Sequence, residues 1–470
     1  MHKPTKISAA ILALVAAGWL AVVPGIVGMR AEEEMKKIAQ NSSEQGSLPI
    51  KTELISFQRG WFSSEAKTDY VVMLGTIPMH FMVEHHINQI AIPFYRWAKI
   101  SHTINVVSDD GKESTLPFNV IASSDRLFFG GYSTLISAPT IHWENADGIG
   151  VMGSNLSLKL VGSIDHPIDY EASIPSLSVT TASDMFKFNL TNLSTSGHNS
   201  ADQSPTARWE QHAHFALEAI DASQNGADVF SMHNIDLNAD LNDNDKTIDV
   251  IYKTKIASTS IGNPKQATAG APAFAAQDIK VDFSYVNLNK EALLNLKKAI
   301  QELNKESLRN AGNADAANSA AQAALDPLQN QQQQLAQANQ LLQKSGDLIR
   351  SSPSIRLDQF SMKTAEGNIS GKAEFNVDGK NFNAQEISIT NIGDLLKSRI
   401  SAKASLNVGR NVFIQGFEDK AGDLNQQRQM KEGMLKAWVQ QGYVKDNGTD
   451  LSLESTYSAQ GLMVNGKQIM

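Results

Sequence analysis

Apolar and polar residues alternate along most of the chain after residue 50. The segment GNISGKAEFNV is a clear example, because Ala373, Phe375 and Val377 fall on one side and the polar residues between them on the other. The same alternation occupies the segments 156–164, 186–190, 235–242, 279–283 and 402–408. Successive side chains of a strand point to opposite faces, so the pattern predicts strands with one apolar and one solvated face, as in antiparallel sheets.

Turn residues separate these segments. The stretches SDDGKES, NADG, VDGKN and VNGKQ carry the Gly, Asn and Asp that β-hairpins require. Strands joined by short turns build a meander, in which each strand pairs with the next one along the chain. The fold class is therefore predicted to be mainly β (α+β), with an extended antiparallel β-sheet or meander as its largest part.

Two stretches follow a helical period instead. From Asn289 to Leu308 apolar residues recur at spacings of three and four, with Asn289 placed as an N-cap. Further along, an apolar stripe repeats every seven residues, at Leu328, Leu335, Leu342 and Ile349. One stripe without a second apolar seam is too narrow for an independent coiled coil. We expect a helical hairpin at 287–352 that lies on the sheet, with self-association of two chains through the stripe as the alternative.

A later helix is predicted at 419–441, where apolar residues lie at helical spacing and Gly442 is placed to cap the C-terminal end. This helix is also expected to pack on the sheet. At 470 residues the chain exceeds the usual size of one compact core, so several regions are expected. They are 50–286, which is rich in strands, the helical 287–352, and 353–470, a second β region that includes the late helix.

The N-terminal region differs from the rest of the chain. Residues 7–29 contain no charged side chain, and a helix of this length, at about 1.5 Å per residue, spans the roughly 30 Å hydrocarbon core of a membrane. A cleaved signal peptide is the alternative, but its apolar core is typically only about 7 to 15 residues long. We therefore predict a cytoplasmic tail and transmembrane signal anchor at 1–30, followed by a linker helix and a break at 31–49.

Composition excludes several kinds of site. The net charge is −8 and no cluster of Lys and Arg appears, so nucleic-acid binding is not expected. The chain has no cysteine, which removes disulfides, thiolate nucleophiles and cysteine zinc sites. The sequence contains no G-x-S-x-G elbow, phosphate-binding loop or H-E-x-x-H zinc motif. We expect no enzyme activity and no cofactor, and a hydrolase assembled from distant residues is the least favoured alternative.

Histidines and acidic residues gather at two places without forming a metal site. His85 and His86 are adjacent, so on a strand their side chains point to opposite faces, and no carboxylate stands at ligand spacing. The run DLNADLNDNDKTID places acidic and amide residues at alternate positions, but Leu241 and Thr247 occupy the positions where a calcium loop needs Gly and Glu. Both places are therefore interpreted as strand residues without a metal.

The segment FQRGWFSS, shortly after the apolar N-terminal run, concentrates unusual residues. Arg59 and two serines invite a catalytic interpretation, but no general base lies nearby in the sequence. We instead predict a hairpin, in which Gly60 takes a positive φ or forms a bulge, and Trp61 and Phe62 pack at the bend. Arg59 would then pair with an acidic neighbour or with lipid headgroups. On this interpretation, replacing Gly60 impairs folding, whereas replacing the two serines after Phe62 with alanine is tolerated.

Two segments resemble a known family. FQRGWFSS followed by an apolar strand, and AWVQQGYVKDNGTDLSLESTYSAQGLMVNGKQI at the C-terminal end, are similar to the YdgA-like family of bacterial envelope proteins, a family of unknown function. The order of anchor, β-rich body, helical block and terminal hairpin is similar too. The resemblance implies a single-pass protein of the bacterial inner membrane, with most of the chain in the periplasm and with self-association, and it supplies no catalytic residues. The layout is also similar, more weakly, to AsmA-like proteins, which are associated with lipid handling in the envelope.

The apolar sheet face leads to the functional prediction. A sheet with one apolar face over several hundred residues must cover that face with a second sheet, helices, another subunit or a ligand. Only about three amphipathic helices are available to cover it. We therefore expect a non-enzymatic envelope protein that contacts inner-membrane lipid and binds a lipid-like or protein partner on this face. A closed sandwich would leave no such site. A homo-oligomeric scaffold for envelope assembly or motility is the alternative function.

Overall fold

The computed structural model describes the chain in separate stretches. They are residues 23–37, 50–74, 77–92, 95–107, 112–116, 118–128, 131–144, 148–163, 166–181, 185–200, 204, 206–262, 274–300, 339, 341–383, 387–388, 391–416 and 423–469. Strands make up 63% of these residues, and adjacent strands pair antiparallel. The predicted fold class, mainly β and antiparallel, is therefore confirmed.

The chain forms two compact units. Unit 1 comprises Met1–Trp143, Ser154–Ala172 and Ile300–Gln322. Unit 2 comprises Glu144–Gly153, Ser173–Ala299 and Ala323–Met470. The strands β8 (Gly150–Ser163) and β9 (His166–Thr180) therefore contribute residues to both units.

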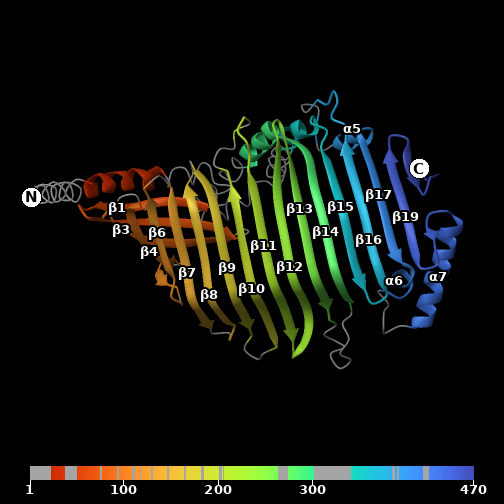
Figure 1. The fold of residues 1–470 in the computed structure, drawn as a ribbon, viewed down its shortest axis with the longest axis horizontal. Coiled ribbons are helices and arrows are strands. Elements are labelled where there is room, and N and C mark those ends of the chain that lie inside the picture. The colour runs from red at the N-terminus through yellow and green to blue at the C-terminus, as the bar shows by residue number, and fades with distance from the viewer. Residues whose placement is uncertain are drawn as a thin grey trace, which may run out of the picture. The chain divides into compact units, whose positions relative to one another are not determined.

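Unit 1 is a meander with one helix packed on it. Its strands are β1 (Ile50–Arg59), β2 (Ser63–Leu74), β3 (Ile77–Asn88), β4 (Arg96–Val107), β5 (Glu113–Thr115), β6 (Ile121–Leu127) and β7 (Tyr132–Glu144). β1 to β4 pair in chain order, β4 pairs with both β5 and β6, and β6 pairs with β7. The helix at 23–37 lies against the unit 1 strands (Figure 1). It packs through Val27 on Ile87, Ala98 and Ile100, and this contact forms the core of the unit.

The position of this helix corrects the predicted membrane segment. Residues 7–22 of that segment lie outside the described residues, but residues 23–29 begin the helix that packs on the sheet. Pro24 is fully buried there and Val27 almost so, although a membrane span would turn such side chains towards lipid. A membrane span that continues to residue 29 is therefore not supported by the described part of the helix. Among the helices of the described part, none has the length and apolar character needed to cross a membrane.

Unit 2 is also an antiparallel meander, coloured from yellow-green to blue in Figure 1. They are β10 (Phe186–Asn199), β11 (Gln211–Gln224), β12 (Ala227–Asn244), β13 (Thr247–Ile261), β14 (Phe274–Asn289), β15 (Ser354–Thr364), β16 (Gly367–Val377), β17 (Ile400–Gly409), β18 (Lys445–Asp446), β19 (Asp450–Ser458), β20 (Gly461–Val464) and β21 (Lys467–Gln468). β10 to β17 pair in chain order, β17 pairs with β19, and β19 pairs with β18 and β20. Because β14 pairs with β15, the strands before and after the predicted helical hairpin belong to one sheet.

Turn residues fix the register of the unit 2 hairpins. Asn225 and Gly226, between β11 and β12, have φ of 53° and 76°, and Asn465 and Gly466, between β20 and β21, have 48° and 82°. Two consecutive positive φ values define the two-residue turn whose twist matches that of paired strands, and Asn-Gly adopts it with little strain. These turns explain why the alternation seen in the sequence becomes a regular antiparallel sheet.

Helices cap the ends of the unit 2 strands. The helix at 290–300 begins as predicted, since the Asn289 side chain accepts a hydrogen bond from the Ala292 N–H at 2.9 Å. The others are a helix at 341–349, α5 (Ile392–Lys397), α6 (Arg410–Gln415) and α7 (Leu424–Gln440). α7 is the predicted late helix, and Gly442 follows its end with a φ of 75° as expected. The sequence pattern missed α5 and α6 because each is only six residues long.

Candidate functional site

The segment FQRGWFSS forms the hairpin between β1 and β2, as predicted, but Gly60 has a different role from the one expected. Gly60 does not have a positive φ, and the bulge of this hairpin lies between Leu54 and Ser56 on β1. A Cβ on Gly60 would lie 2.3 Å from the Ser63 carbonyl oxygen, far inside van der Waals contact. Glycine is therefore required by the close approach of the chain to itself and not by backbone conformation.

The aromatic residues of the motif do not pack inside the bend. Trp61 and Phe62 are both more than half exposed, so the prediction that they pack there is wrong. The Trp61 ring instead lies along Gly25 of the helix, where an added Cβ would stand 3.2 Å from the ring. Arg59 pairs with Glu32 of the same helix at 3.8 Å, which confirms the expected acidic neighbour.

A buried glutamine holds this hairpin to the helix. Gln89 is fully buried, and its amide nitrogen donates to the carbonyl oxygens of Trp61, at 2.9 Å, and Pro24, at 3.1 Å. Its amide oxygen accepts from the Ser64 hydroxyl, and its backbone N–H donates to the Phe62 carbonyl at 2.9 Å. We therefore expect alanine to be less well tolerated at Ser64 than the sequence alone suggested, because the loss of its hydroxyl would leave a buried amide oxygen without its donor. Gln89 lies outside the motif, which is why the sequence did not reveal it.

Replacing Gly60 with alanine is expected to lower the free energy of unfolding by about 1–3 kcal/mol, because the new Cβ overlaps the Ser63 carbonyl and the turn must shift. Thermal and urea unfolding of the full chain would measure the change. Gly433→Ala is the matched control, since an added Cβ there meets nothing within 4 Å and alanine favours the helix. Equal stabilities of the two variants would show that the turn can relax.

A chain of partly buried hydrogen bonds crosses five strands of unit 1. His85 Nδ1 lies 2.7 Å from His102 Nδ1, between β3 and β4. His85 Nε2 lies 3.0 Å from the Thr68 hydroxyl on β2, and His102 Nε2 lies 2.8 Å from the Ser124 hydroxyl on β6. Ser124 in turn lies 2.9 Å from the Thr134 hydroxyl on β7. Every ring nitrogen of the two histidines therefore has a hydrogen-bond partner.

Both histidines of this chain are held neutral. Burial, with a smaller contribution from the neighbouring ring, lowers the pKa of His85 to about 3, and burial lowers the pKa of His102 to about 4. A neutral imidazole carries one N–H, so one of the two facing Nδ1 atoms donates and the other accepts. His86 points to the exposed face, as predicted for adjacent residues of a strand. Within the described stretches, no three His, Cys, Asp or Glu side chains are placed to hold a metal ion.

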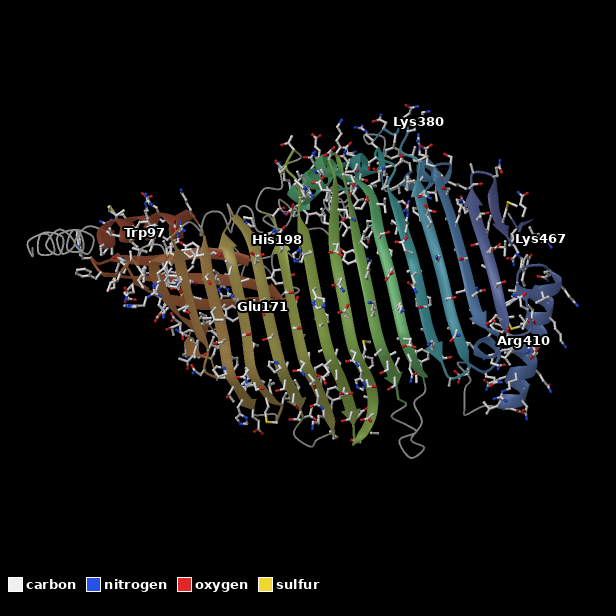
Figure 2. All side chains as sticks on the ribbon, viewed as in Figure 1. Trp97, Glu171, His198, Lys380, Arg410 and Lys467 are labelled. Atoms are coloured by element: carbon white, nitrogen blue, oxygen red, sulfur yellow. The ribbon has the colours of Figure 1, made fainter. Side chains whose placement is uncertain are left out.

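A cavity of about 280 Å³ lies between the helix at 23–37 and the unit 1 sheet. Apolar side chains such as Val27, Ile100 and Trp97 line it, and Figure 2 shows Trp97 beside this helix. Its polar end is occupied by Glu34, which accepts hydrogen bonds from Arg126 at 3.0 and 3.1 Å and another from the Tyr132 hydroxyl. Burial and the charge of Glu34 hold the pKa of that hydroxyl well above its usual range. These groups bind one another, so they fasten the helix and leave no activated nucleophile or base.

Part of one face of the unit 2 sheet carries no charged residue, and this part is here called the apolar face. Register places three rows of side chains on it across β12 to β17 and β19. One row is Leu241, Val250, Tyr285, Ile355, Phe375, Ala402 and Tyr457. The next is Ala239, Tyr252, Phe283, Leu357, Ala373, Ala404 and Ser455. The third is Leu237, Thr254, Val281, Phe360, Gly371, Leu406 and Leu453.

The apolar face is open to solvent. None of the residues in its three rows is buried, and Tyr285, Ile355, Phe375 and Leu406 are between 36% and 41% exposed. Under a second sheet these central side chains would be almost completely buried. The opposite face carries charges of both signs, for example Arg356 beside Glu374 at 3.5 Å. The two faces therefore differ as the alternation predicted, and the apolar one has no covering layer among the described elements.

Comparison with known proteins gives one match. The family described as "Bacterial protein of unknown function (DUF945)" matches residues 1–470. The chain belongs to this family. No curated protein and no solved structure matches the chain. The match extends over both units, so a DUF945 domain includes the hairpin and helix of unit 1 as well as the open sheet of unit 2.

The predicted site residues are only partly brought together in this DUF945 chain. Arg59 is the last residue of β1, and Gly60, Trp61 and Phe62 form the turn that follows it. Of the predicted self-association stripe, Leu328 and Leu335 lie outside the described residues, whereas Leu342 and Ile349 lie on the helix at 341–349 and are half-buried. Gln89 and the pair His85 and His102 were not predicted as partners. Their contacts depend on the pairing of β2, β3 and β4, which no local pattern specifies.

Proposed function

We propose that this DUF945 protein is a non-enzymatic, membrane-anchored protein of the bacterial inner membrane that binds lipid acyl chains on the apolar face of unit 2. The exposure of that face is the observation that supports the proposal most directly. Soluble monomers rarely expose contiguous apolar patches larger than a few hundred Å², and larger ones usually mark a binding surface. Anchoring is supported by the uncharged residues 7–22, and a periplasmic body by the similarity to YdgA-like proteins.

Acyl chains suit the chemistry of the apolar face better than a protein partner does. Protein interfaces usually combine an apolar centre with a polar rim and many hydrogen bonds. The three rows of the apolar face contain no charged residue and few polar groups. A hydrocarbon chain needs no hydrogen bonds, and covering apolar surface contributes roughly 25 cal/mol per Å². The partner is therefore proposed to contact the face through hydrocarbon alone.

The dimensions of the apolar face are also suitable. Paired strands lie about 4.8 Å apart, so the rows from β12 to β19 extend over roughly 29 Å. A membrane hydrocarbon core of roughly 30 Å holds two acyl chains end to end, so one complete chain needs about half of this length and fits along a row. The middle row is rich in alanine over β16 and β17, between rows that carry Phe375 and Leu406. A chain lying there would contact larger side chains on both sides.

The proposal can be tested by lipid retention. The full chain, extracted from membranes with a mild detergent, is expected to carry phospholipid that native mass spectrometry detects, and to bind phosphatidylglycerol with a pyrene-labelled acyl chain. The double variant Phe375→Glu and Leu406→Glu should lower pyrene-lipid affinity at least about tenfold, because two carboxylates would have to be buried under hydrocarbon.

The control variant is Asn376→Glu with Asn407→Glu. These residues are the sequence neighbours of Phe375 and Leu406 and point to the opposite face, so the added charge is the same. Circular dichroism would verify that both double variants stay folded. Wild-type protein without bound lipid would contradict the proposal. So would a stable dimer in which the apolar faces of two copies cover each other, because that result would support the scaffold alternative.

A further inference from the structure

Apolar side chains also gather at one edge of unit 1. Trp61 and Phe62, in the turn after β1, are 57% and 53% exposed. Ile90, Ile92 and Tyr95, after the end of β3, are 45%, 43% and 55% exposed. We call these five residues the aromatic edge. Single exposed apolar residues are common on proteins, but five large ones in two short adjacent segments are not.

Hydrogen bonds hold the two segments of the aromatic edge together. The Gln89 backbone N–H donates to the Phe62 carbonyl, and the Gln89 side chain donates to the Trp61 carbonyl. The next residues therefore leave the sheet directly beside the turn. Two further contacts hold Ile92 and Tyr95 in place. They are a β-bridge between Ile92 and Arg96 and a hydrogen bond from the Tyr95 N–H to the Ile92 carbonyl at 3.2 Å. The aromatic edge is thus formed by two segments that hydrogen bonds connect to each other.

The start of the helix at 23–37 lies at the same edge. Gln89 donates to the Pro24 carbonyl, and the Trp61 ring lies along Gly25. Ile26, the next residue, is 42% exposed. The uncharged residues 7–22 directly precede this point in the chain. If they are anchored in a membrane, the aromatic edge is held close to that membrane.

We propose that the aromatic edge inserts into the interface of a lipid bilayer, so that unit 1 rests on the membrane beside the anchor. Trp and Tyr favour this zone, where their rings meet hydrocarbon and their polar atoms meet headgroups and water. Arg59, directly before the turn, is exposed and pairs with Glu32 at 3.8 Å, and a cation at this position also attracts anionic headgroups. The edge shares no residue with the apolar face of unit 2, so one set of residues would contact the bilayer and the other would bind single lipids.

The absence of cysteine in the chain permits a direct test. Single variants Phe62→Cys and Ile92→Cys, labelled with an environment-sensitive NBD dye, would be reconstituted as full chains into phosphatidylethanolamine and phosphatidylglycerol vesicles. On vesicles, the dye emission is expected to shift to shorter wavelength. When the vesicles include lipids with a shallow doxyl quencher, the emission intensity is expected to fall about twofold or more. Thr103→Cys is the control, because Thr103 is exposed on β4 of the same unit but lies outside the edge.

The outcomes separate this inference from the proposed function, on whose membrane anchor it rests. Protein that floats with the vesicles but shows no more quenching at positions 62 and 92 than at position 103 would overturn the inference and leave the anchor intact. A blue shift without doxyl quenching would also overturn it, since it would indicate contact with protein. Failure to float would contradict the anchor itself. The Phe375→Glu and Leu406→Glu variant should keep the quenching while losing bound lipid.

Discussion

Acidification is expected to destabilise unit 1 steeply, with the free energy of unfolding falling as the pH drops from about 6.5 towards 4. The cause is the pair His85 and His102, whose folded-state pKa values are about 3 and about 4 against an ordinary value of 6.5. Each histidine contributes about 1.4 kcal/mol per pH unit over the range in which only the unfolded chain is protonated. Two of them together give one of the largest effects expected from any pair of residues in this chain.

The direction follows from proton binding. Between pH 6.5 and the folded pKa values, the unfolded chain binds protons at both histidines and the folded chain binds none. The free energy of unfolding therefore rises with pH in this window, and the contribution of the two histidines is complete above pH 6.5. It is lost as the pH falls, and the loss levels off near the folded pKa values. A proton on the accepting Nδ1 would also place two N–H groups face to face across the 2.7 Å contact, and a proton on each ring would place two charges there.

The measurement is urea unfolding of the full chain at a series of pH values, followed by circular dichroism. The double variant His85→Gln and His102→Gln is the control, since amides can donate and accept hydrogen bonds but do not titrate. Its dependence on pH should be clearly shallower than that of the wild type, while the remaining histidines contribute equally to both. Parallel curves for the two proteins would mean that the buried pair is not what responds to acid.

The strands were predictable because the alternation of apolar and polar side chains can be seen within each strand alone. In an antiparallel sheet with unlike faces, every second side chain is apolar, so Ala373, Phe375 and Val377 indicate their strand without any partner being known. Turns and caps are equally local. Asn289 and Gly442 were identified from their own positions, because a cap depends only on the helix end next to it.

The contacts of the candidate site were not predictable, because they join residues that are distant in sequence. His85 meets His102 only through the register of β3 with β4, and Gln89 meets Pro24 only after the helix packs on the sheet. The sequence also could not separate two environments for residues 23–29. An uncharged apolar helix is equally suited to lipid and to the apolar side of a sheet, and Val27 shows that here the sheet is its partner.

The second large effect concerns a buried ion pair in unit 2. Lys290 Nζ lies 2.6 Å from the Asp243 carboxylate, and their side chains are only 3% and 6% exposed. The carboxylate also accepts hydrogen bonds from the backbone N–H groups of Trp209, at 2.6 Å, and Asp245, at 2.9 Å. Lys290 donates in addition to the Ala207 carbonyl at 3.1 Å. The pair thus joins the turn between β12 and β13 to the start of the helix at 290–300.

The environment of Asp243 explains why breaking this pair is costly. Burial alone would raise the pKa of the Asp243 carboxyl, but hydrogen bonds from Lys290 and the Trp209 N–H outweigh burial and hold it below its usual value. The carboxylate is therefore charged when folded. Without Lys290 it would remain buried with no cation, and removing one member of a buried pair typically costs about 3–5 kcal/mol.

Lys290→Met is accordingly expected to lower the free energy of unfolding by about 3–5 kcal/mol, measured by urea unfolding of the full chain at neutral pH. The matched control is Lys363→Met, which breaks the 2.7 Å pair of Lys363 with Asp278 on the same sheet. Both of those side chains are about 60% exposed, so solvent screens the pair and its loss should lower the free energy of unfolding far less than the loss of the buried pair. The double variant Lys290→Met with Asp243→Asn should recover part of the loss, because no uncompensated charge then remains buried. Equal costs for Lys290→Met and Lys363→Met would show that the Asp243 carboxylate is solvated, and the helix at 290–300 would then have to be held by its apolar contacts alone.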